Sequence, residues 1–442
     1  MRIFILILLF SPIGLLSQEA LTLEQAVSYG LANNYQIAIA KRNLEIANNN
    51  NDWGVAGRYP SVALTLNNNN SFVNQQNPAG SFALSQSILN NNILPGIEAS
   101  WTVFDGYRVR YTKAQLERQA QLEANNVQLN AQQVVQNVVL AYYNVLIQRE
   151  QLDLFDEILA LSRDRIEYQE IRKEFGQAVT FDVLQVNDAY LDDSTSYLIQ
   201  LNTLNNAKRN LLLAMGVDDL TLSFTLADQL DYEAPNYALE QLLQTLEANN
   251  IQVQGARIQR ELARSQTQLA EAAKYPTVNL MGGMTYNYAV SNGSLDLANG
   301  ETVEINNGIG KTFNPFIGVQ ARYNLYTGGV REIQIENART QELVADLSLQ
   351  DLQRNLTNQV ANTLATYQNQ KQLLALTGTR IDNARLNLDI AEERFRGGQI
   401  NSFDYRNIQL SFLNANQARL NALFNLRNTE TELLRLTGEL VR

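Results

Sequence analysis

Few residues of this chain can perform acid–base, nucleophilic or metal chemistry. Its 442 residues include no His and no Cys, which removes imidazole catalysis, thiolate nucleophiles, disulfides and the usual zinc sites. Asp/Glu pairs and Ser–Lys pairs remain, and none of them occurs in a recognisable catalytic loop motif. We therefore expect no enzyme activity, no metal site and no cofactor.

Two carboxylates recur at matching positions, Asp182 in FGQAVTFDVLQ and Asp404 in FRGGQINSFDYRN. Each follows a Gly-Gln pair that contains Gly176 or Gly398. A glycine there supplies the backbone conformation that ends one helix before the next begins. Each Asp then falls in the first turn of the new helix, where a carboxylate gains about 0.3–1 kcal/mol from the helix dipole. Ordinary helix chemistry is therefore one complete explanation of these residues.

Both motifs belong to a tandem duplication of the chain. A gapless alignment joins LEQAVSYGLANNYQIAIAKRNLEIA, from Leu23, to LEQLLQTLEANNIQVQGARIQRELA, from Leu239. In each copy a Tyr-Pro-Ser/Thr-Val junction follows, FDGYRVR matches YTGGVRE, and LLLAMG matches LLRLTG. We predict a first structural repeat over 18–232 and a second over 233–442.

The first 17 residues have the pattern of a secretory signal peptide. Arg2 precedes an apolar run from Ile3 to Phe10, and small or polar residues follow at 17–18. The run is too short for a helix that spans a membrane. A buried N-terminal helix is the alternative, but we expect cleavage near Ser17 and export of the chain.

Long helices are the next predicted elements. From Val127 to Ile166, apolar and small residues recur at alternating spacings of four and three, which is a heptad seam with polar interruptions at Gln148 and Ser162. We predict a helix from about Tyr107 to Arg172, roughly 100 Å long at 1.5 Å per residue. Further helices are predicted over 329–396 and 403–437. Helices of this length favour a coiled-coil assembly over a compact enzyme.

Between the helices the hydrophobic period changes to two. The predicted strands cover about 61–72, 94–104, 277–290 and 315–326, with polar Asn/Gly-rich connections inside each pair. A soluble, half-buried sheet is the alternative for any single strand. Four such strands in symmetric positions, each about ten residues long, favour a membrane β-barrel.

The alternation assigns a face of the sheet to each side chain. The residues predicted to face lipid are Trp101, Val103, Val278, Leu280, Val319 and Tyr323. Those predicted to face the lumen are Glu98, Thr102, Gln320 and Arg322. Four strands leave edges that lipid cannot satisfy, and the smallest single-chain barrels have about eight strands, so we expect an oligomer.

With these motifs in order and in duplicate, the chain resembles the TolC family of outer membrane efflux proteins. The resemblance implies a mixed α and β membrane protein that forms a homotrimer. Four transmembrane β-strands per chain would complete a 12-stranded barrel, joined to a long α-helical coiled-coil barrel. It implies a place in the outer membrane, with the helical tunnel in the periplasm, and contact with outer membrane lipid.

The resemblance also implies a function. The chain would be the exit duct of a tripartite efflux system or a type I secretion system. Its partners would be a periplasmic adaptor protein and an inner-membrane pump or ABC transporter. The helical tips that would dock the adaptor contain Gly176, Gln177, Gly397, Gly398 and Gln399.

By the same resemblance, Asp404 would stand at the constricted periplasmic entrance and act as a gate residue. The family pattern has a second acid three residues later, where this chain has Asn407. A trimer would therefore carry one ring of carboxylates instead of two. We expect this to weaken any block of the entrance by multivalent cations.

The acidic composition agrees with this interpretation. A formal net charge of −11 argues against a nucleic-acid partner and would place a negative field around a water-filled lumen. A secreted or periplasmic coiled-coil scaffold would explain the heptads and leave the four amphipathic strands unexplained. A diffusion porin would explain the strands and leave the long helices unexplained.

Overall fold

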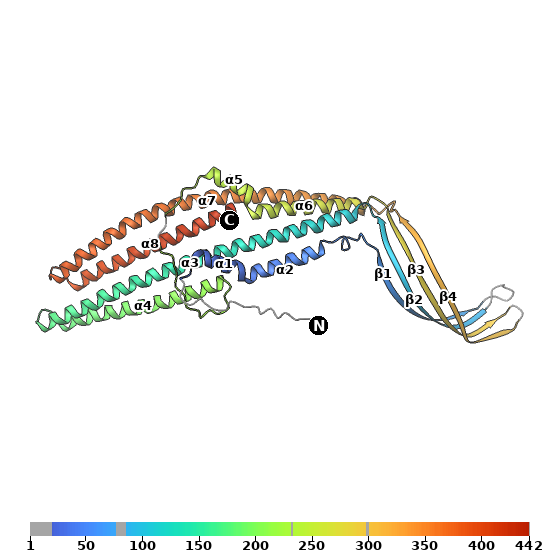
Figure 1. Ribbon diagram of the computed structural model, residues 1–442, viewed down its shortest axis with the longest axis horizontal. Helices are drawn as coiled ribbons and strands as arrows, with labels where there is room; N and C mark the ends of the chain where they lie inside the picture. Colours follow the sequence, from blue (N-terminus) through green and yellow to red (C-terminus); the bar gives the residue numbers. More distant parts are fainter. Residues whose placement is uncertain (1–19, 77–84, 231–232, 298–299, 442) are drawn as a thin grey trace, which may run out of the picture. The chain divides into compact units, whose positions relative to one another are not determined.

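The computed structural model describes residues 20–76, 85–230, 233–297 and 300–441 (Figure 1). The predicted signal peptide at 1–17 lies outside this range. The chain forms two compact units. The first combines the described residues up to Leu44 with those of 123–257 and 348–441, and the second combines the described residues of 45–122 and 258–347. Each unit draws segments from both sequence repeats, so a repeat is a recurring order of elements and not a separate body.

The order of elements is the same in both repeats (Figure 1). The first contains α1 (Leu23–Asn33), α2 (Tyr35–Asn50), β1 (Ser61–Gln75), β2 (Ser85–Phe104), α3 (Arg108–Glu174) and α4 (Thr180–Ala214). The second contains α5 (Leu239–Asn249), α6 (Ile251–Ala272), β3 (Thr277–Asp296), β4 (Thr302–Arg322), α7 (Val330–Arg396) and α8 (Ser402–Thr437). The predicted long helices are confirmed with small shifts at their ends. Among the described helices, none is both long and apolar enough to cross a membrane.

A duplicated Asn joins each short helix pair to the end of a long hairpin. Asn34 separates α1 from α2, and its side-chain amide donates to the carbonyl of Ala214 at 3.3 Å. Asn250 separates α5 from α6, and its amide donates to the carbonyl of Leu436 at 2.8 Å. The Asn side chain thus satisfies a carbonyl at the C-terminal end of a helix, which has no partner inside its own helix.

The glycines that end LLLAMG and LLRLTG lie beside these joints. Gly216 has φ +74° and Gly438 has φ +77°. A Cβ atom at Gly216 would stand 2.9 Å from the carbonyl oxygen of Asn33, and one at Gly438 would stand 2.4 Å from that of Asn249. Both the backbone conformation and the close approach therefore require glycine.

The buried stripe of α3 follows the predicted heptad seam at first and then leaves it. Val134, Val138 and Val145 are buried as the seam predicts. Further along, the seam residue Ser162 is buried, but Phe155, Leu159 and Ile166 are only partly buried. The other buried positions there are Leu154, Ile158, Arg165 and Gln169. Val134, Val138 and Val145 pack in a cluster with residues of α1 and α4, whereas Leu154 and Ile158 pack with residues of α7 and α8. The buried face of α3 therefore changes because its neighbours change along the helix.

The four strands form one antiparallel sheet in the order β1-β2-β3-β4. β1 and β3 begin directly after Pro60 and Pro276, because proline cannot donate to a strand ladder. Most strand ends differ from the prediction: β2 and β4 begin earlier, β1 and β3 end later, and β4 ends at Arg322 and not at 326. The hydrophobic alternation marks only the apolar part of each strand, while the backbone ladder continues through polar pairs such as Asn69 with Asn92.

Candidate functional site

The register of the sheet brings the predicted lumen residues to one face. Thr102 pairs with Asn279, and Asn279 pairs with Gln320. The hydroxyl of Thr102 donates to the side-chain oxygen of Asn279 at 3.0 Å. Because side chains alternate between faces along a strand, Glu98 shares the face of Thr102, and Arg322 shares the face of Gln320. The four residues therefore lie on a common, largely polar face.

The opposite face is apolar. Trp101 pairs with Leu280, and Leu280 pairs with Val319. The exposed fraction reaches 82% for both Leu64 and Ile317. The same face carries Val62, Leu64, Leu66, Ile97, Val278, Met284, Tyr286, Phe313 and Ile317. An exposed apolar surface of this extent is unfavourable in water and marks a surface for burial in lipid or against protein.

Two residues of the predicted lipid-facing set are not assigned to a face by this register. Val103 lies where the pairing of β2 with β3 shifts between Thr102 and Phe104. Tyr323 follows the last residue of β4. Alternation applies only to paired residues within a regular strand, so the lipid-facing assignment of these two residues stays a prediction.

The sheet has two open edges. Among the described residues, β1 pairs only with β2, and β4 pairs only with β3. The outer side of each edge strand therefore presents unpaired backbone N–H and C=O groups. Inside a lipid bilayer such groups must find partners, and closure into a barrel supplies them.

A second candidate region is the pair of helical tips between α3 and α4 and between α7 and α8. Gly176 has φ +73° and Gly398 has φ +69°. The next residue in each tip, Gln177 or Gln399, donates its backbone N–H to a carbonyl in the last turn of the preceding helix, at 2.7 Å and 2.8 Å. This is the usual glycine-dependent helix end. Gly397 completes the second tip, and all five predicted tip residues are exposed.

The tips also expose large apolar side chains. The exposed fraction is 76% for Phe175, 69% for Phe181 and 60% for Phe403. The glycines stand in open space, since a Cβ atom at Gly176 or Gly398 would meet nothing within 4 Å. The tips therefore present apolar rings beside accessible backbone, a surface suited to contact with another protein.

The two tip carboxylates are used differently. At the start of α4, Val179 has no side-chain acceptor, and its backbone N–H donates to the Asp182 carboxylate at 3.0 Å. At the start of α8, Asn401 accepts the backbone N–H of Asp404 at 2.8 Å. The Asp404 carboxylate is exposed and forms no ion pair with any described residue. Both acids lie in the first turn of a helix, where the helix dipole favours a carboxylate, but only Asp182 also accepts a backbone N–H at the helix start.

Asn407 lies one turn after Asp404 and is also exposed. The two residues are three apart on α8, so their side chains share one face of the helix. Asn407 lines a groove of about 370 Å³ between α7 and α8, together with Arg394 and Ser411.

Sequence reasoning missed a buried polar cluster behind the tips. Asp193 of α4 accepts two hydrogen bonds from the guanidinium of Arg406 on α8, at 2.8 Å and 2.5 Å. The hydroxyl of Ser162 on α3 donates to the same carboxylate at 2.5 Å. This bidentate pair joins the α3–α4 hairpin to α8 through a buried, charge-assisted contact. The polar Ser162 within the heptad seam was the one sequence signal that could have pointed to it.

Arg165 is the second cation of this region and is 2% exposed. Its Nη1 donates to the side-chain oxygen of Gln409 at 3.0 Å, and its Nε and Nη2 have no hydrogen-bond partner among the described residues. Burial, reinforced by the nearby charge of Arg406, lowers the pKa of Arg165 to about 10, and the Asp193 carboxylate opposes this shift.

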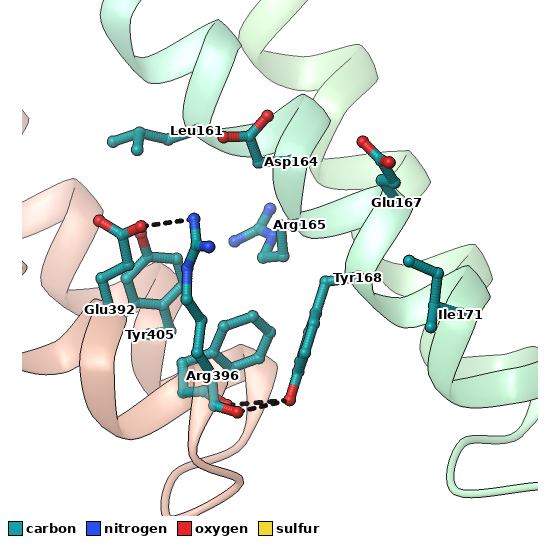
Figure 2. Close-up of a pocket in the computed structure, with 10 residues that line it drawn as sticks. Leu161, Asp164, Arg165, Glu167, Tyr168, Ile171, Glu392, Arg396 and Tyr405 are labelled. Carbon is teal, nitrogen blue, oxygen red and sulfur yellow. Dashed lines mark hydrogen bonds and ion pairs between the residues drawn. The ribbon is translucent and has the colours of Figure 1, made fainter. Parts of the chain in front are cut away.

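Arg165 borders a pocket of about 290 Å³ between α3 and the second hairpin. Figure 2 shows its guanidinium pointing from α3 toward the side formed by Glu392, Arg396 and Tyr405. Arg396 is paired with Glu392 at 2.7 Å, and the Tyr168 hydroxyl donates to the carbonyl of Arg396 at 3.0 Å. These contacts tie the two hairpins together near their tips. The described part of the chain contains no cluster of acids that could hold a metal ion.

The family model described as "Outer membrane efflux protein" matches residues 26–217 and 242–439. The two matched segments correspond to the two repeats, and together they include both strand pairs and both helical hairpins.

Two relatives illustrate the sequence similarity. The chain is 24% identical over 245 residues to the outer membrane protein TolC of Vibrio cholerae serotype O1, which is 55% of this chain and 53% of that relative. The aligned region thus spans about half the length of that relative. It is 21% identical over 346 residues to the outer membrane efflux protein BepC of Brucella suis, 78% of this chain and 72% of that one.

Two solved structures have the same fold as this chain. The chain matches the transmembrane channel CusC with a TM-score of 0.73 at 15% identity, over 94% of this chain and 92% of that one. It matches the outer membrane protein VceC from Vibrio cholerae with a TM-score of 0.72 at 16% identity, over 94% and 96%. The fold of the single chain is therefore TolC-like. With the family model covering both repeats, the chain belongs to the outer membrane efflux protein family and resides in the outer membrane.

Proposed function

We propose that this protein is an exit duct that passes substrates from the periplasm to the exterior, as the outer membrane part of a tripartite efflux or type I secretion system. The observation that supports this most is the sheet, which has one apolar face, one polar face and two open edges. Three chains joined edge to edge would close a 12-stranded barrel and leave no edge exposed to lipid.

The polar face would line the lumen of this barrel. Glu98, Thr102, Gln320 and Arg322 would then contact water and substrate. The long helices would form the periplasmic part of the duct. The exposed rings and glycines of the tips would meet a periplasmic adaptor, which would bring an inner-membrane pump or ABC transporter to the duct.

Asp404 is our candidate for the gate residue of the periplasmic entrance. Its support is that the Asp404 carboxylate is exposed in the first turn of α8 and has no ion pair within the described residues. Asn407 on the same helix face adds no second charge. Three copies of Asp404 would form a single carboxylate ring.

Single-cysteine labelling tests the duct directly, because the chain has no native cysteine. Glu98→Cys and Gln320→Cys should react with a water-soluble maleimide in assembled protein. Leu280→Cys and Val319→Cys, one register row in the same sheet, should stay unlabelled because lipid covers them. Equal reaction of both sets would contradict the barrel.

A second measurement separates the duct from a periplasmic scaffold. The duct should remain with the outer membrane fraction until detergent extracts it, and it should form channels in a planar bilayer. Free solubility after cell lysis, without channel activity, would favour the scaffold.

A further inference from the structure

We infer that the junction of α2, β2 and α3 binds the phosphate of an anionic phospholipid at the rim of the apolar sheet face. The site, which we term the basic junction, consists of Arg58, Arg110 and Lys113 with the rings of Trp53 and Tyr107. This inference rests on the proposed function, in which the sheet stands in a bilayer.

Aromatic rings hold the three cations in place. The guanidinium carbon of Arg58 lies 4.9 Å from the centroid of the Trp53 ring, and the Lys113 ammonium lies 5.7 Å from the same ring. Lys113 also donates to the side-chain oxygen of Asn51 at 2.6 Å. The Arg110 guanidinium lies 5.9 Å from the Tyr107 ring. Cation–π contacts of this kind orient a charge without neutralising it.

Trp101 connects the basic junction to the apolar face. Its indole N–H donates to the backbone carbonyl of Arg58 at 2.9 Å, while its ring lies in the register row of Leu280 and Val319. A Trp with a polar tip bonded at the edge of an apolar surface is typical of the membrane–water interface. Both tryptophans of the chain, Trp53 and Trp101, belong to this region.

The cations of the basic junction have no acidic partner within the described residues. Other cations of the same compact unit do: Arg331 pairs with Glu332 at 2.7 Å, and Arg339 pairs with Glu271 at 2.6 Å. Three positive charges without an ion pair therefore lie in one region of a chain whose net charge is −11. Such a region can bind an anion that is not part of the chain. A phospholipid fits, because its acyl chains can cover the apolar face while its phosphate reaches the rim.

The second repeat lacks this arrangement. The residues that correspond to Trp53, Arg58, Arg110 and Lys113 are Leu269, Lys274, Glu332 and Ile335. Lys274 is paired with Glu271 at 3.5 Å, and Glu332 reverses the charge at its position. The duplicated junction therefore has one basic copy, and each chain would hold one phosphate site.

Lipid binding by the purified, assembled protein tests the inference. Phosphatidylglycerol is titrated into the detergent-solubilised protein and counted by native mass spectrometry, with zwitterionic phosphatidylcholine as the comparison lipid. We expect phosphatidylglycerol to bind more tightly to the wild type. Arg58→Ala combined with Lys113→Ala should weaken this binding about tenfold or more, since each basic residue near an anionic lipid surface contributes on the order of a fivefold change.

Lys274→Ala, at the corresponding position of the second repeat, is the matched control and should bind like the wild type. The charge-preserving pair Arg58→Lys with Lys113→Arg should retain binding. If the double alanine variant does not assemble, Arg110→Gln provides the same test on an exposed side chain.

Unchanged phosphatidylglycerol binding in the alanine variants, or equal binding of the two lipids to the wild type, would overturn the inference. Failure of the proposed function gives a different result, namely cysteine labelling of both sheet faces. Normal labelling together with equal binding of the two lipids to the wild type would therefore reject the basic junction and leave the duct intact.

Discussion

Single side chains at the helical tips differ between repeats in ways that bear on transport. Position 179 is Val, and the corresponding position 401 is Asn. The Val179 side chain accepts no hydrogen bond, and the Asp182 carboxylate accepts the backbone N–H of Val179. The Asn401 side chain accepts the backbone N–H of Asp404. The Asp404 carboxylate, unlike that of Asp182, contacts no described backbone N–H, and Asp404 is a candidate gate residue.

The first prediction concerns this gate. In planar bilayers, Asp404→Ala should relieve block by divalent or trivalent cations added on the periplasmic side, because it removes the carboxylate ring. Asn407→Asp should deepen the block by adding a second ring on the same helix face. Asp182→Ala is the matched control; it should leave the block unchanged and cost about 1 kcal/mol of helix stability. Block that persists in Asp404→Ala would rule out this residue as the constriction.

The second prediction concerns the buried pair of Asp193 and Arg406. Their side chains are 6% and 16% exposed, so Asp193→Asn would leave the Arg406 charge buried without its counter-ion. We expect a loss of roughly 3–5 kcal/mol in the free energy of unfolding, measured by denaturant titration of the assembled protein. Replacing both residues, as in Asp193→Leu with Arg406→Met, should recover much of this loss. A single variant as stable as the wild type would show that the pair does not hold the hairpins together.

At the scale of elements, the helical hairpins depend on their turns and the strands depend on their register. Both tips end a long helix with a glycine in the left-handed region, Gly176 or Gly398. The strands continue beyond the apolar bands that identified them, because polar Asn pairs satisfy the backbone ladder as well as apolar pairs do. Turn chemistry and backbone pairing thus set the limits of the elements.

The third prediction concerns the tips. Gly176→Val and Gly398→Val force a β-branched residue into φ values near +70°, at a cost of about 1–2 kcal/mol each. If the tips dock an adaptor, transport should fall sharply while assembled protein still reaches the outer membrane. Gly378→Ala, inside α7 with open space around the added Cβ, should instead stabilise its helix by about 1 kcal/mol and leave transport intact. Normal transport in both tip variants would refute the docking role.

At the scale of the whole molecule, a trimer would carry three times the negative net charge of one chain. The chain has a net charge of −11, and removal of Arg2 with the predicted signal peptide would make it more negative. A water-filled duct formed by three such chains would concentrate cations through its electrostatic field.

The fourth prediction follows from that field. In a KCl gradient, the reversal potential of the reconstituted duct should show selectivity for cations. The selectivity should weaken as salt rises toward 1 M, where the Debye length falls to about 3 Å. Glu98→Gln should reduce the selectivity if that carboxylate lines the lumen, and Glu439→Gln, on the short segment after α8, is a control outside the barrel. Anion selectivity would contradict the proposed lumen.

The sequence by itself determined the features that depend on neighbouring residues. Period-two alternation predicted four strands, heptad spacing predicted the long helices, and the Gly-Gln motifs predicted where one helix ends before the next begins. The duplication made each of these signals appear twice. Such features are local, because backbone conformation and side-chain direction follow from residues a few positions apart.

Only the tertiary structure decided which distant residues meet. The pairing of Thr102 with Asn279 and Gln320 depends on strand register, and the contact of Asp193 with Arg406 joins helices from different repeats. The tertiary structure also decides which cations form ion pairs, because it sets the positions of the acidic side chains. Within the described residues it places no acid in an ion pair with Arg58, Arg110 or Lys113. These contacts depend on packing between segments that are remote in the sequence, and local hydrophobic periodicity does not predict that packing.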